Sequence, residues 1–369
     1  VLAWNCPEFL HLIYAAPAAG RILVPLNARL APAELIYQLR SSGATTLFAE
    51  PALLAPLLAH PDAPPDLQLV PLDAGFADWV HDGPEAPLPT TRADDPVWIL
   101  YTSGTTGRPK GAVLTHASFL SGLRSAALGR PVNKSDRYLY PFPLFHVAAH
   151  NVLLQHHHGA AVVLVKSFDA AETLRCCRDL QVTTLSLAPT MIAMLLDHPD
   201  FAAADLASVR SIGYGASNMP ADLLRRLLAQ ADIELCQSYG MTELSGSVSF
   251  LTPEDHRAAA AGHPALLASV GRPLPTARVR LADDRGNDSA PGIAGEILVQ
   301  AEQCMQGYWA QPEATAAAIR NGWLHTGDIG QFDDQGYLYI IDRKKDMILS
   351  GGENVASREV EDVLRQHPA

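Results

Sequence analysis

The chain has 369 residues, of which 48% are hydrophobic and 18% charged, a balance typical of a folded globular protein rather than of a disordered one. This length allows two domains, or one large domain with subdomains. The net charge of −12 argues against nucleic acid or an anionic membrane surface as the main partner. No apolar run reaches the length of about 18 residues that a membrane-spanning helix needs, so we expect no membrane span.

The N-terminal part of the sequence alternates helical patterns with short apolar runs. The segment "PAELIYQLRSSG" (32–43) has the apolar spacing of a helix and ends in polar residues. The segment "AAGRILVPLN" (18–27) is typical of a helix end, a glycine stop and a buried strand. Residues 60–96 contain eight prolines and little periodicity, which predicts an irregular crossing segment.

From Val97 to about Leu251 short apolar runs alternate with amphipathic helical patterns. The apolar runs are 160–168, 183–189, 209–217 and 233–240, and helical patterns occupy 169–180 and 220–231. This alternation predicts parallel α/β units with right-handed crossovers. After Gly271 the pattern changes to short strands separated by Asp-Asp-Arg-Gly and glycine turns, which predicts a small antiparallel or barrel-like lobe.

One stretch, "YTSGTTGRPKGAVLTH" (101–116), combines three glycines and a lysine with several hydroxyl side chains. Its apolar flanks predict a strand, a polar turn, and then a second strand or a helix start. Small residues let the backbone approach a ligand closely, and amide, hydroxyl and ammonium groups all donate hydrogen bonds. A phosphate is the expected ligand. The spacing is not that of a P-loop, because Gly111 follows Lys110 where Ser or Thr is required.

The cysteines and histidines point away from a metal centre. The five cysteines form no C-x-x-C pair, which argues against a disulfide framework or a zinc knuckle and favours a reducing cytosol, so we expect a cytoplasmic protein. The run His156, His157 and His158 cannot direct three consecutive side chains at one ion, so we interpret it as the end of a helix.

Five segments in order carry a family resemblance. They are "YTSGTTGRPKG" (101–111), "PLFHVAA" (143–149), "YGMTE" (239–243), "GWLHTGD" (322–328) and "DRKKDMILSGGEN" (342–354). Together they resemble the signature segments of the adenylate-forming (AMP-binding) superfamily, which includes acyl- and aryl-CoA ligases and peptide-synthetase adenylation domains. The resemblance is greatest to fatty-acid and medium-chain acyl-CoA synthetases.

The resemblance implies a fold and a division of the chain. It implies the α/β N-terminal domain of an adenylate-forming enzyme over residues 1–341, with α/β subdomains in 1–270 and a small β lobe in 271–341. A hinge is expected at 342–345, and 346–369 would begin a C-terminal domain. We expect a chain truncated at both ends, because it begins with Val1 and stops at Ala369 just past a predicted helix. No lysine fits the context of the family's adenylation lysine, so the isolated chain would be weakly active or inactive.

The activity that the resemblance implies is attack of a carboxylate on the α-phosphate of ATP, giving an acyl-adenylate, followed by transfer to the thiol of CoA. Magnesium is required, with Glu243 as its ligand and Thr102 as a further candidate. Thr242 matches a hydroxyl donor to the α-phosphate, and His146 matches a position beside the reacting carboxylate. The residues assigned to the phosphate loop are Thr102, Ser103, Gly104, Thr105, Thr106, Gly107 and Lys110.

The remaining assignments concern the nucleotide, the hinge and the thiol. Asp328 and Arg343 match ribose contacts, and Tyr239 matches the aromatic that stacks on adenine. Lys345 matches the hinge residue, and Gly351 and Gly352 match glycines that flank the CoA tunnel. The full nucleotide-binding set is Gly215, Ala216, Ser217, Tyr239, Gly240, Asp328 and Arg343.

Three alternatives remain open at this point. Small and apolar residues near the expected pocket, such as Val147, Ala148 and Met241, favour a fatty acid with an apolar tail. The first alternative is an aryl-CoA ligase, and the second is a ligase that loads a carrier protein. The third is a catalytically silent nucleotide- or acyl-binding module. The sequence gives neither the acid nor the oligomeric state.

Overall fold

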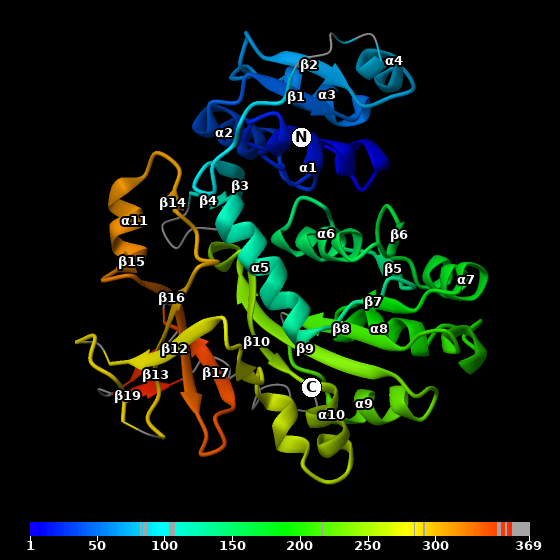
Figure 1. Cartoon of the computed structure of the whole chain (residues 1–369), viewed down its shortest axis with the longest axis vertical. Coiled ribbons are helices and arrows are strands. Elements are labelled where there is room, and N and C mark those ends of the chain that lie inside the picture. The colour runs from blue at the N-terminus through cyan, green and yellow to red at the C-terminus, as the bar shows by residue number, and fades with distance from the viewer. Residues whose placement is uncertain are drawn as a thin grey trace.

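In a computed structural model of the chain, the structure describes residues 1–81, 83, 87–102, 108–215, 217–283, 285–290 and 292–344, and the backbone of 348–350 and 353–355. Figure 1 shows three regions: N-terminal helices with a small sheet at the top, a large sheet with its helices in the middle, and a second group of strands at the lower left. Helix α5 (His116–Gly129) crosses the middle of the molecule between them.

The large sheet has seven strands in the order β11-β10-β9-β8-β7-β5-β6. The five strands from β5 to β9 are parallel, and β10 and β11 add an antiparallel edge. The strands are β5 (Arg137–Tyr140), β6 (Ala161–Leu164), β7 (Thr184–Ser186), β8 (Ser211–Gly215), β9 (Glu234–Met241), β10 (Gly246–Leu251) and β11 (Arg272–Pro273). The predicted parallel α/β arrangement is confirmed.

Amphipathic helices connect these strands. The helices that follow successive strands are α6 (His150–His157), α7 (Ala170–Leu180), α8 (Pro189–Leu196), α9 (Ala221–Leu228) and α10 (Pro253–Ala260). Helix α7 begins where Asp169 accepts a hydrogen bond from the backbone N–H of Glu172. In α9 the apolar side chains Leu223, Leu224 and Leu227 are buried against the sheet, while its arginines remain outside. The histidine run ends α6, as predicted.

The glycine-rich stretch lies between two antiparallel strands. Strand β3 (Pro96–Thr102) pairs with β4 (Lys110–Thr115), and β14 (Gly307–Tyr308) adds to the other side of β4. Helix α5 starts directly after β4, where Thr115 and Ser118 cap each other's backbone N–H groups. The prediction of a strand on each side of this stretch is therefore confirmed, while residues 103–107 lie outside the described residues.

The N-terminal region differs from its prediction in two places. Its elements are α1 (Pro7–Ala18), α2 (Pro32–Ser42), β1 (Thr46–Ala49), α3 (Pro51–Leu58), β2 (Gln68–Pro71) and α4 (Phe76–His81). The strand predicted within 18–27 is wrong, because Leu23 makes only an isolated bridge to Trp98 and Pro25 has no N–H to continue a ladder. The segment 60–96 is not wholly irregular, since it contains β2, which pairs with β1, and α4.

Most strands after Gly271, apart from β11 and β14, form the antiparallel lobe that their turn pattern predicts. They are β12 (Ala277–Ala282), β13 (Gly295–Ala301), β15 (Ile319–Arg320), β16 (Trp323–Phe332) and β17 (Leu338–Arg343), with α11 (Pro312–Ala318) before β15. The pairing order is β12-β13-β16-β15, and β17 also pairs with β16. A hairpin of β18 (Ile348–Ser350) and β19 (Glu353–Val355) follows.

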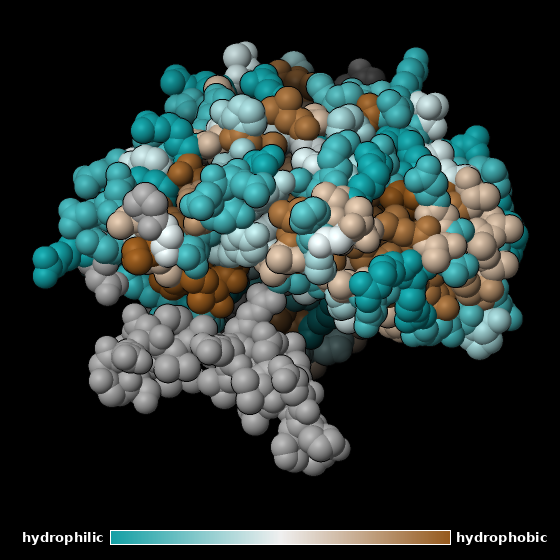
Figure 2. Space-filling model, turned by 90° about the horizontal axis from the view of Figure 1, so that it is seen from below, coloured by the Kyte–Doolittle hydropathy of each residue, from teal (hydrophilic) through white to brown (hydrophobic). Residues whose placement is uncertain are grey.

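The surface of the molecule is mixed in polarity, and its cysteines are unpaired. Figure 2 shows one face on which hydrophilic side chains predominate and apolar ones form patches between them. No helix in the described part of the chain is long and apolar enough to cross a membrane. All five cysteines are free thiols.

One ion pair ties together the starts of three parallel strands. Asp136, just before β5, accepts hydrogen bonds from Nε of Arg210 at 2.9 Å, the hydroxyl of Thr183 at 2.9 Å and the backbone N–H of Asn133 at 2.7 Å. Burial of the Asp136 carboxyl opposes its ionisation, but these hydrogen bonds outweigh burial, so its pKa lies below the ordinary value of 3.8.

We expect Asp136→Asn to lower the free energy of unfolding by about 2 kcal/mol at neutral pH, because a buried charged hydrogen-bond acceptor is lost. A carboxyl whose pKa is lowered on folding stabilises the protein above its unfolded pKa and loses this effect as the pH falls through the folded pKa. The difference between wild type and variant in denaturant titrations should therefore shrink below about pH 4. Asp197→Asn, at an exposed pair with Arg226, is the control and should change little. An Asp136→Asn variant as stable as the control would contradict this role.

Candidate active site

A cavity of about 410 Å³ lies between α5, α6 and the adjoining ends of β8, β9 and β10. Its lining includes Val147, Ala148 and Met241, which the sequence analysis expected near the pocket, and also Phe142, which it did not name. It also includes polar groups that the sequence did not place there. These are Arg130, His150, Asn151, Gln155, Ser186, Ser238 and Ser247. The cavity is therefore apolar along part of its wall and polar elsewhere.

The cavity reaches residues predicted for both the nucleotide and the acid. Gly215, Gly240 and Thr242, from the predicted nucleotide and catalytic sets, line it together with His146. Gly215 ends β8 and has little free space, because a Cβ there would lie 2.9 Å from the carbonyl oxygen of Ser238. Ser217, two residues after Gly215, is exposed and does not line the cavity.

Strands β9 and β10 approach each other very closely at the mouth of the cavity. A Cβ on Gly240 would lie 1.9 Å from the carbonyl oxygen of Gly246, so only glycine fits. Gly246 itself has a φ of +125°, and a Cβ there would lie 2.6 Å from the imidazole ring of His150. The turn between the strands is the short 3-10 segment η3 (Thr242–Leu244). The backbone N–H of Met305, from a distant part of the chain, donates a hydrogen bond to the carbonyl oxygen of Glu243 in this segment.

The side chain of Glu243 is buried, with 5% of its surface exposed. Its Oε1 accepts hydrogen bonds from the hydroxyls of Thr102 at 3.2 Å and Tyr308 at 2.9 Å. No cation among the described residues pairs with it, and neither hydroxyl bonds to its Oε2. Burial and the neighbouring carboxylate both raise the pKa of the Tyr308 phenol. Lys110 lies nearby, with its Nζ 5.2 Å from the centre of the Tyr308 ring.

A second carboxylate lies where β9 meets the antiparallel lobe. Asp328 of β16 accepts a hydrogen bond from the hydroxyl of Tyr239 at 2.8 Å, and Nε of Arg343 lies 3.5 Å from its Oδ1. Burial raises the pKa of Asp328, although Tyr239 and Arg343 act in the opposite direction. The pKa of Tyr239 is raised by burial and by this carboxylate. Three residues that the sequence assigned to the nucleotide thus meet, although they come from three different strands.

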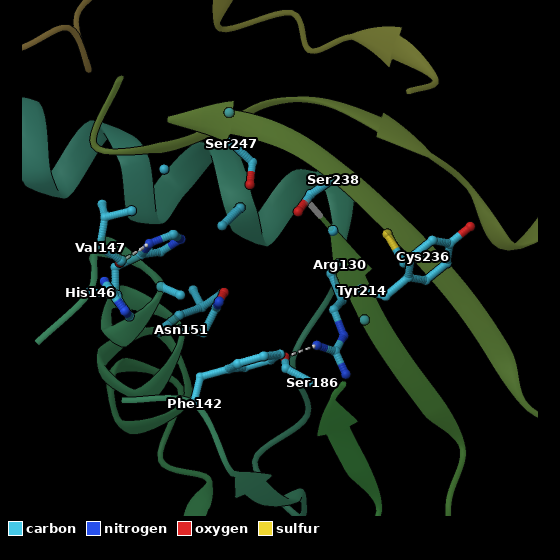
Figure 3. A pocket seen from close by; sticks show the side chains of 18 of the residues that line it. Arg130, Phe142, His146, Val147, Asn151, Ser186, Tyr214, Cys236, Ser238 and Ser247 are labelled. Carbon is cyan, nitrogen blue, oxygen red and sulfur yellow. Dashed lines mark hydrogen bonds between the residues drawn. The ribbon is translucent and has the colours of Figure 1, made fainter. Parts of the chain in front are cut away.

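His146 begins the short segment η1 (Val147–Ala149) and faces the cavity in Figure 3. Desolvation, and then the charge of Arg29, lower the pKa of its imidazole below 6.5, which favours the neutral ring at neutral pH. His150, one turn later, hydrogen-bonds through Nδ1 to the carbonyl of Val147 at 2.8 Å. Its Nε2 is buried without a partner among the described residues.

Several predicted residues lie outside the part of the chain that the structure describes, and their assignments stay predictions. They are Ser103, Gly104, Thr105, Thr106 and Gly107 of the phosphate loop, Ala216 of the nucleotide set, the hinge residue Lys345, and Gly351 and Gly352 of the CoA tunnel.

Tyr308 and Arg130 are among the site residues that the sequence analysis missed. Tyr308, which bonds to Glu243, comes from β14, about sixty residues further along the chain. Arg130, which lines the cavity, directly follows α5 and has the sequence context of an ordinary helix end. No local motif surrounds either residue, so one sequence offers no signal for them.

Comparisons with known proteins agree with this geometry. The profile of the AMP-binding enzyme family matches residues 1–309. The indoleacetate–CoA ligase of Aromatoleum aromaticum is 35% identical over 100% of this chain and 72% of its own length. A long-chain-fatty-acid–CoA ligase of Mycobacterium tuberculosis is 36% identical over 98% of this chain and 71% of its own length. A fatty acid–[acyl-carrier-protein] ligase of Streptomyces coeruleorubidus is 35% identical over 98% and 70%. These relatives support acid–thiol ligation and leave the acid open.

Solved structures give the same result for the fold. The fatty acyl CoA synthetase of Mycobacterium tuberculosis superposes with a TM-score of 0.86 and 34% identity, covering 100% of this chain and 72% of that one. The O-succinylbenzoate coenzyme A synthetase of Bacillus subtilis, in complex with ATP and a magnesium ion, gives 0.84 and 31%, covering 100% and 74%. The chain belongs to the AMP-binding enzyme family, and its fold is that of the N-terminal domain of adenylate-forming enzymes.

Proposed function

We propose that this chain carries the acid- and nucleotide-binding site of an AMP-forming acid–CoA ligase. A carboxylate oxygen of the acid would attack the α-phosphorus of ATP, and pyrophosphate would leave. The thiol of CoA would then take the acyl group and release AMP. The observation that carries this proposal is the single cavity that Gly215, Gly240, Thr242 and His146 line together, because it joins the predicted nucleotide residues to a space for the acid.

The described residues suit the two substrates in different ways. Asp328, held between Tyr239 and Arg343, offers a carboxylate that can accept from both ribose hydroxyls. The hydroxyl of Thr242 is available to the α-phosphate at the cavity mouth. A neutral His146 beside the cavity can donate or accept a hydrogen bond without repelling or neutralising the reacting carboxylate.

Magnesium fits the donor set at Glu243. A buried carboxylate whose described partners are two hydroxyls lacks a compensating cation, which is costly. Magnesium prefers few carboxylates together with phosphate oxygens, so Glu243, with the hydroxyl of Thr102 beside it, would hold the ion. When bound, the ion would neutralise charge on the phosphates. The O-succinylbenzoate synthetase complex with ATP and magnesium supports this assignment by analogy.

The acid and the acceptor are the finer points of the proposal. The sequence resemblance favours a fatty acid, and an apolar wall that includes Phe142, Val147 and Met241 suits either an alkyl chain or an aromatic ring. CoA is the proposed acceptor. A carrier-protein thiol is the second candidate, favoured by the carrier-protein ligase among the relatives.

The proposal is tested by pyrophosphate release from the full-length protein that contains this chain, across a panel of fatty and aromatic acids, with and without CoA. An acid class that gives release and yields acyl-CoA would support the CoA ligase. Release with an accumulating adenylate and no response to CoA would indicate a carrier-protein acceptor. Silence with every acid, while AMP or ATP still binds, would contradict the proposal and favour a binding module.

Glu243→Gln should lower kcat for pyrophosphate release by about 10²–10³, because an amide cannot replace a carboxylate as a magnesium ligand. Acid binding and the thermal unfolding midpoint should change little. Glu254→Gln is the matched control, since the Glu254 carboxylate is exposed and pairs only with Arg257 in the described part of the chain. An unchanged rate in Glu243→Gln would remove this residue from the metal site.

Asp328→Asn should raise KM for ATP about tenfold to a hundredfold, since two charged hydrogen bonds to the ribose would be weakened. Its effect on kcat at saturating ATP should be smaller. Steady-state kinetics with ATP varied measure both values, and Asp288→Asn, at an exposed pair with Arg280, serves as the control. Equal KM values in Asp328→Asn and wild type would mean that the ribose binds elsewhere.

A further inference from the structure

The cavity contains a guanidinium whose charge is not matched by any carboxylate among the described residues. Arg130 follows the last residue of α5, and its side chain enters the sheet side of the cavity. Its Nη1 donates to the hydroxyl of Ser186 at 3.0 Å, and its Nη2 donates to Thr184 and to the carbonyl of Leu185. Every described hydrogen-bond acceptor is a neutral oxygen, and Cζ of Arg130 lies 5.8 Å from the centre of the Tyr138 ring.

The carboxylate of Asp136 influences the pKa of Arg130 but already has another partner. Asp136 forms its ion pair with Arg210, the residue before Ser211, whose carbonyl accepts a hydrogen bond from Arg130. Burial lowers the pKa of Arg130, which reflects the cost of holding its charge in this environment. A buried charge is normally matched by an opposite charge, because hydroxyls and carbonyls recover only part of the lost hydration.

The guanidinium also has donor capacity left. Nη1 carries two hydrogens and makes one hydrogen bond within the described part of the chain, to Ser186. It lies against the bare backbone of Gly213, where a Cβ would approach it to 2.3 Å. Both Gly213 and Ser186 line the cavity, so a ligand there can reach this edge of the guanidinium.

Arg130 lies on the side of the cavity opposite His146, which marks the proposed reacting end. In Figure 3 His146 and Val147 lie on one side of the cavity, and Arg130, Tyr214 and Cys236 lie on the other. Phe142 contributes apolar surface between the two sides. An acid whose carboxylate lies near His146 would therefore extend its other end toward Arg130.

We propose that the cavity selects acids with a second carboxylate at the far end of an apolar body, and that Arg130 and Ser186 bind this distal carboxylate. The inference rests on the proposed function, since it takes His146 to mark the reacting end. A carboxylate supplies the missing negative charge and accepts from the free Nη1 hydrogen and from the Ser186 hydroxyl. A methyl end would leave the half-buried guanidinium without a counter-charge.

Direct binding tests this proposal independently of catalysis. Calorimetry of the purified protein, with and without AMP, would compare octanedioate with octanoate and terephthalate with para-toluate. Within at least one pair, the diacid should bind about tenfold to a hundredfold more tightly, as expected for a charged hydrogen-bonded contact. Equal binding in both pairs, tighter binding of the methyl-ended acids, or no binding of any acid would overturn it. Pyrophosphate release is measured separately, so a failed proposed function is recognised on its own.

Arg130→Gln should remove the preference for the diacid and leave the affinity for its methyl-ended partner within about threefold, because the apolar wall is unchanged. Arg130→Lys should restore part of the preference. Arg137→Gln, at an exposed arginine that contacts Leu180 outside the cavity, is the matched control and should keep the full preference. A merely structural Arg130 would instead give a variant with a lower unfolding midpoint and equal losses for both acids, which would contradict the proposal.

Discussion

The close approach of β9 and β10 at Gly240 and Gly246 is the constraint on which the site depends. Gly240 has no room for a side chain because the carbonyl of Gly246 lies against it. Glycine at this position therefore lets β9 and β10 stay close together on either side of η3. Tyr239, just before this point, reaches Asp328, and Glu243, just after it, reaches Thr102 and Tyr308. One strand end thus fixes the distance between the proposed ribose contact and the proposed metal ligand, and it forms the mouth of the acid cavity.

The distribution of buried charge separates structural from functional roles. Asp136 is fully compensated, with Arg210, Thr183 and a backbone N–H around it, and it ties strand starts together. Glu243 and Arg130, by contrast, have only neutral partners among the described residues. Such groups raise the free energy of the ligand-free protein and lower it when an opposite charge binds. In our account, magnesium matches Glu243 and a distal carboxylate matches Arg130.

The sequence predicted what local patterns encode and missed what the tertiary structure assembles. Apolar alternation predicted the parallel sheet and the antiparallel lobe that the structure shows, and contiguous motifs proposed Glu243, Tyr239 and Asp328 as site residues. The prediction of a strand in 18–27 was wrong because Pro25 has no N–H to continue the pairing with β3 beyond Leu23. The apolar content of the segment does not show whether a neighbouring strand pairs with it. Tyr308 and Arg130 could not be predicted, since each acts through contacts with residues distant in the sequence.

Transfer of a heavy-oxygen label tests the central claim most directly. The protein is given ATP, CoA and its best acid labelled in the carboxylate, and the released nucleotide is analysed by mass spectrometry. Attack of the carboxylate on the α-phosphorus predicts that AMP carries one labelled oxygen after each turnover. Label in inorganic phosphate, with ADP as the nucleotide product, or acyl transfer that leaves AMP unlabelled, would contradict the account.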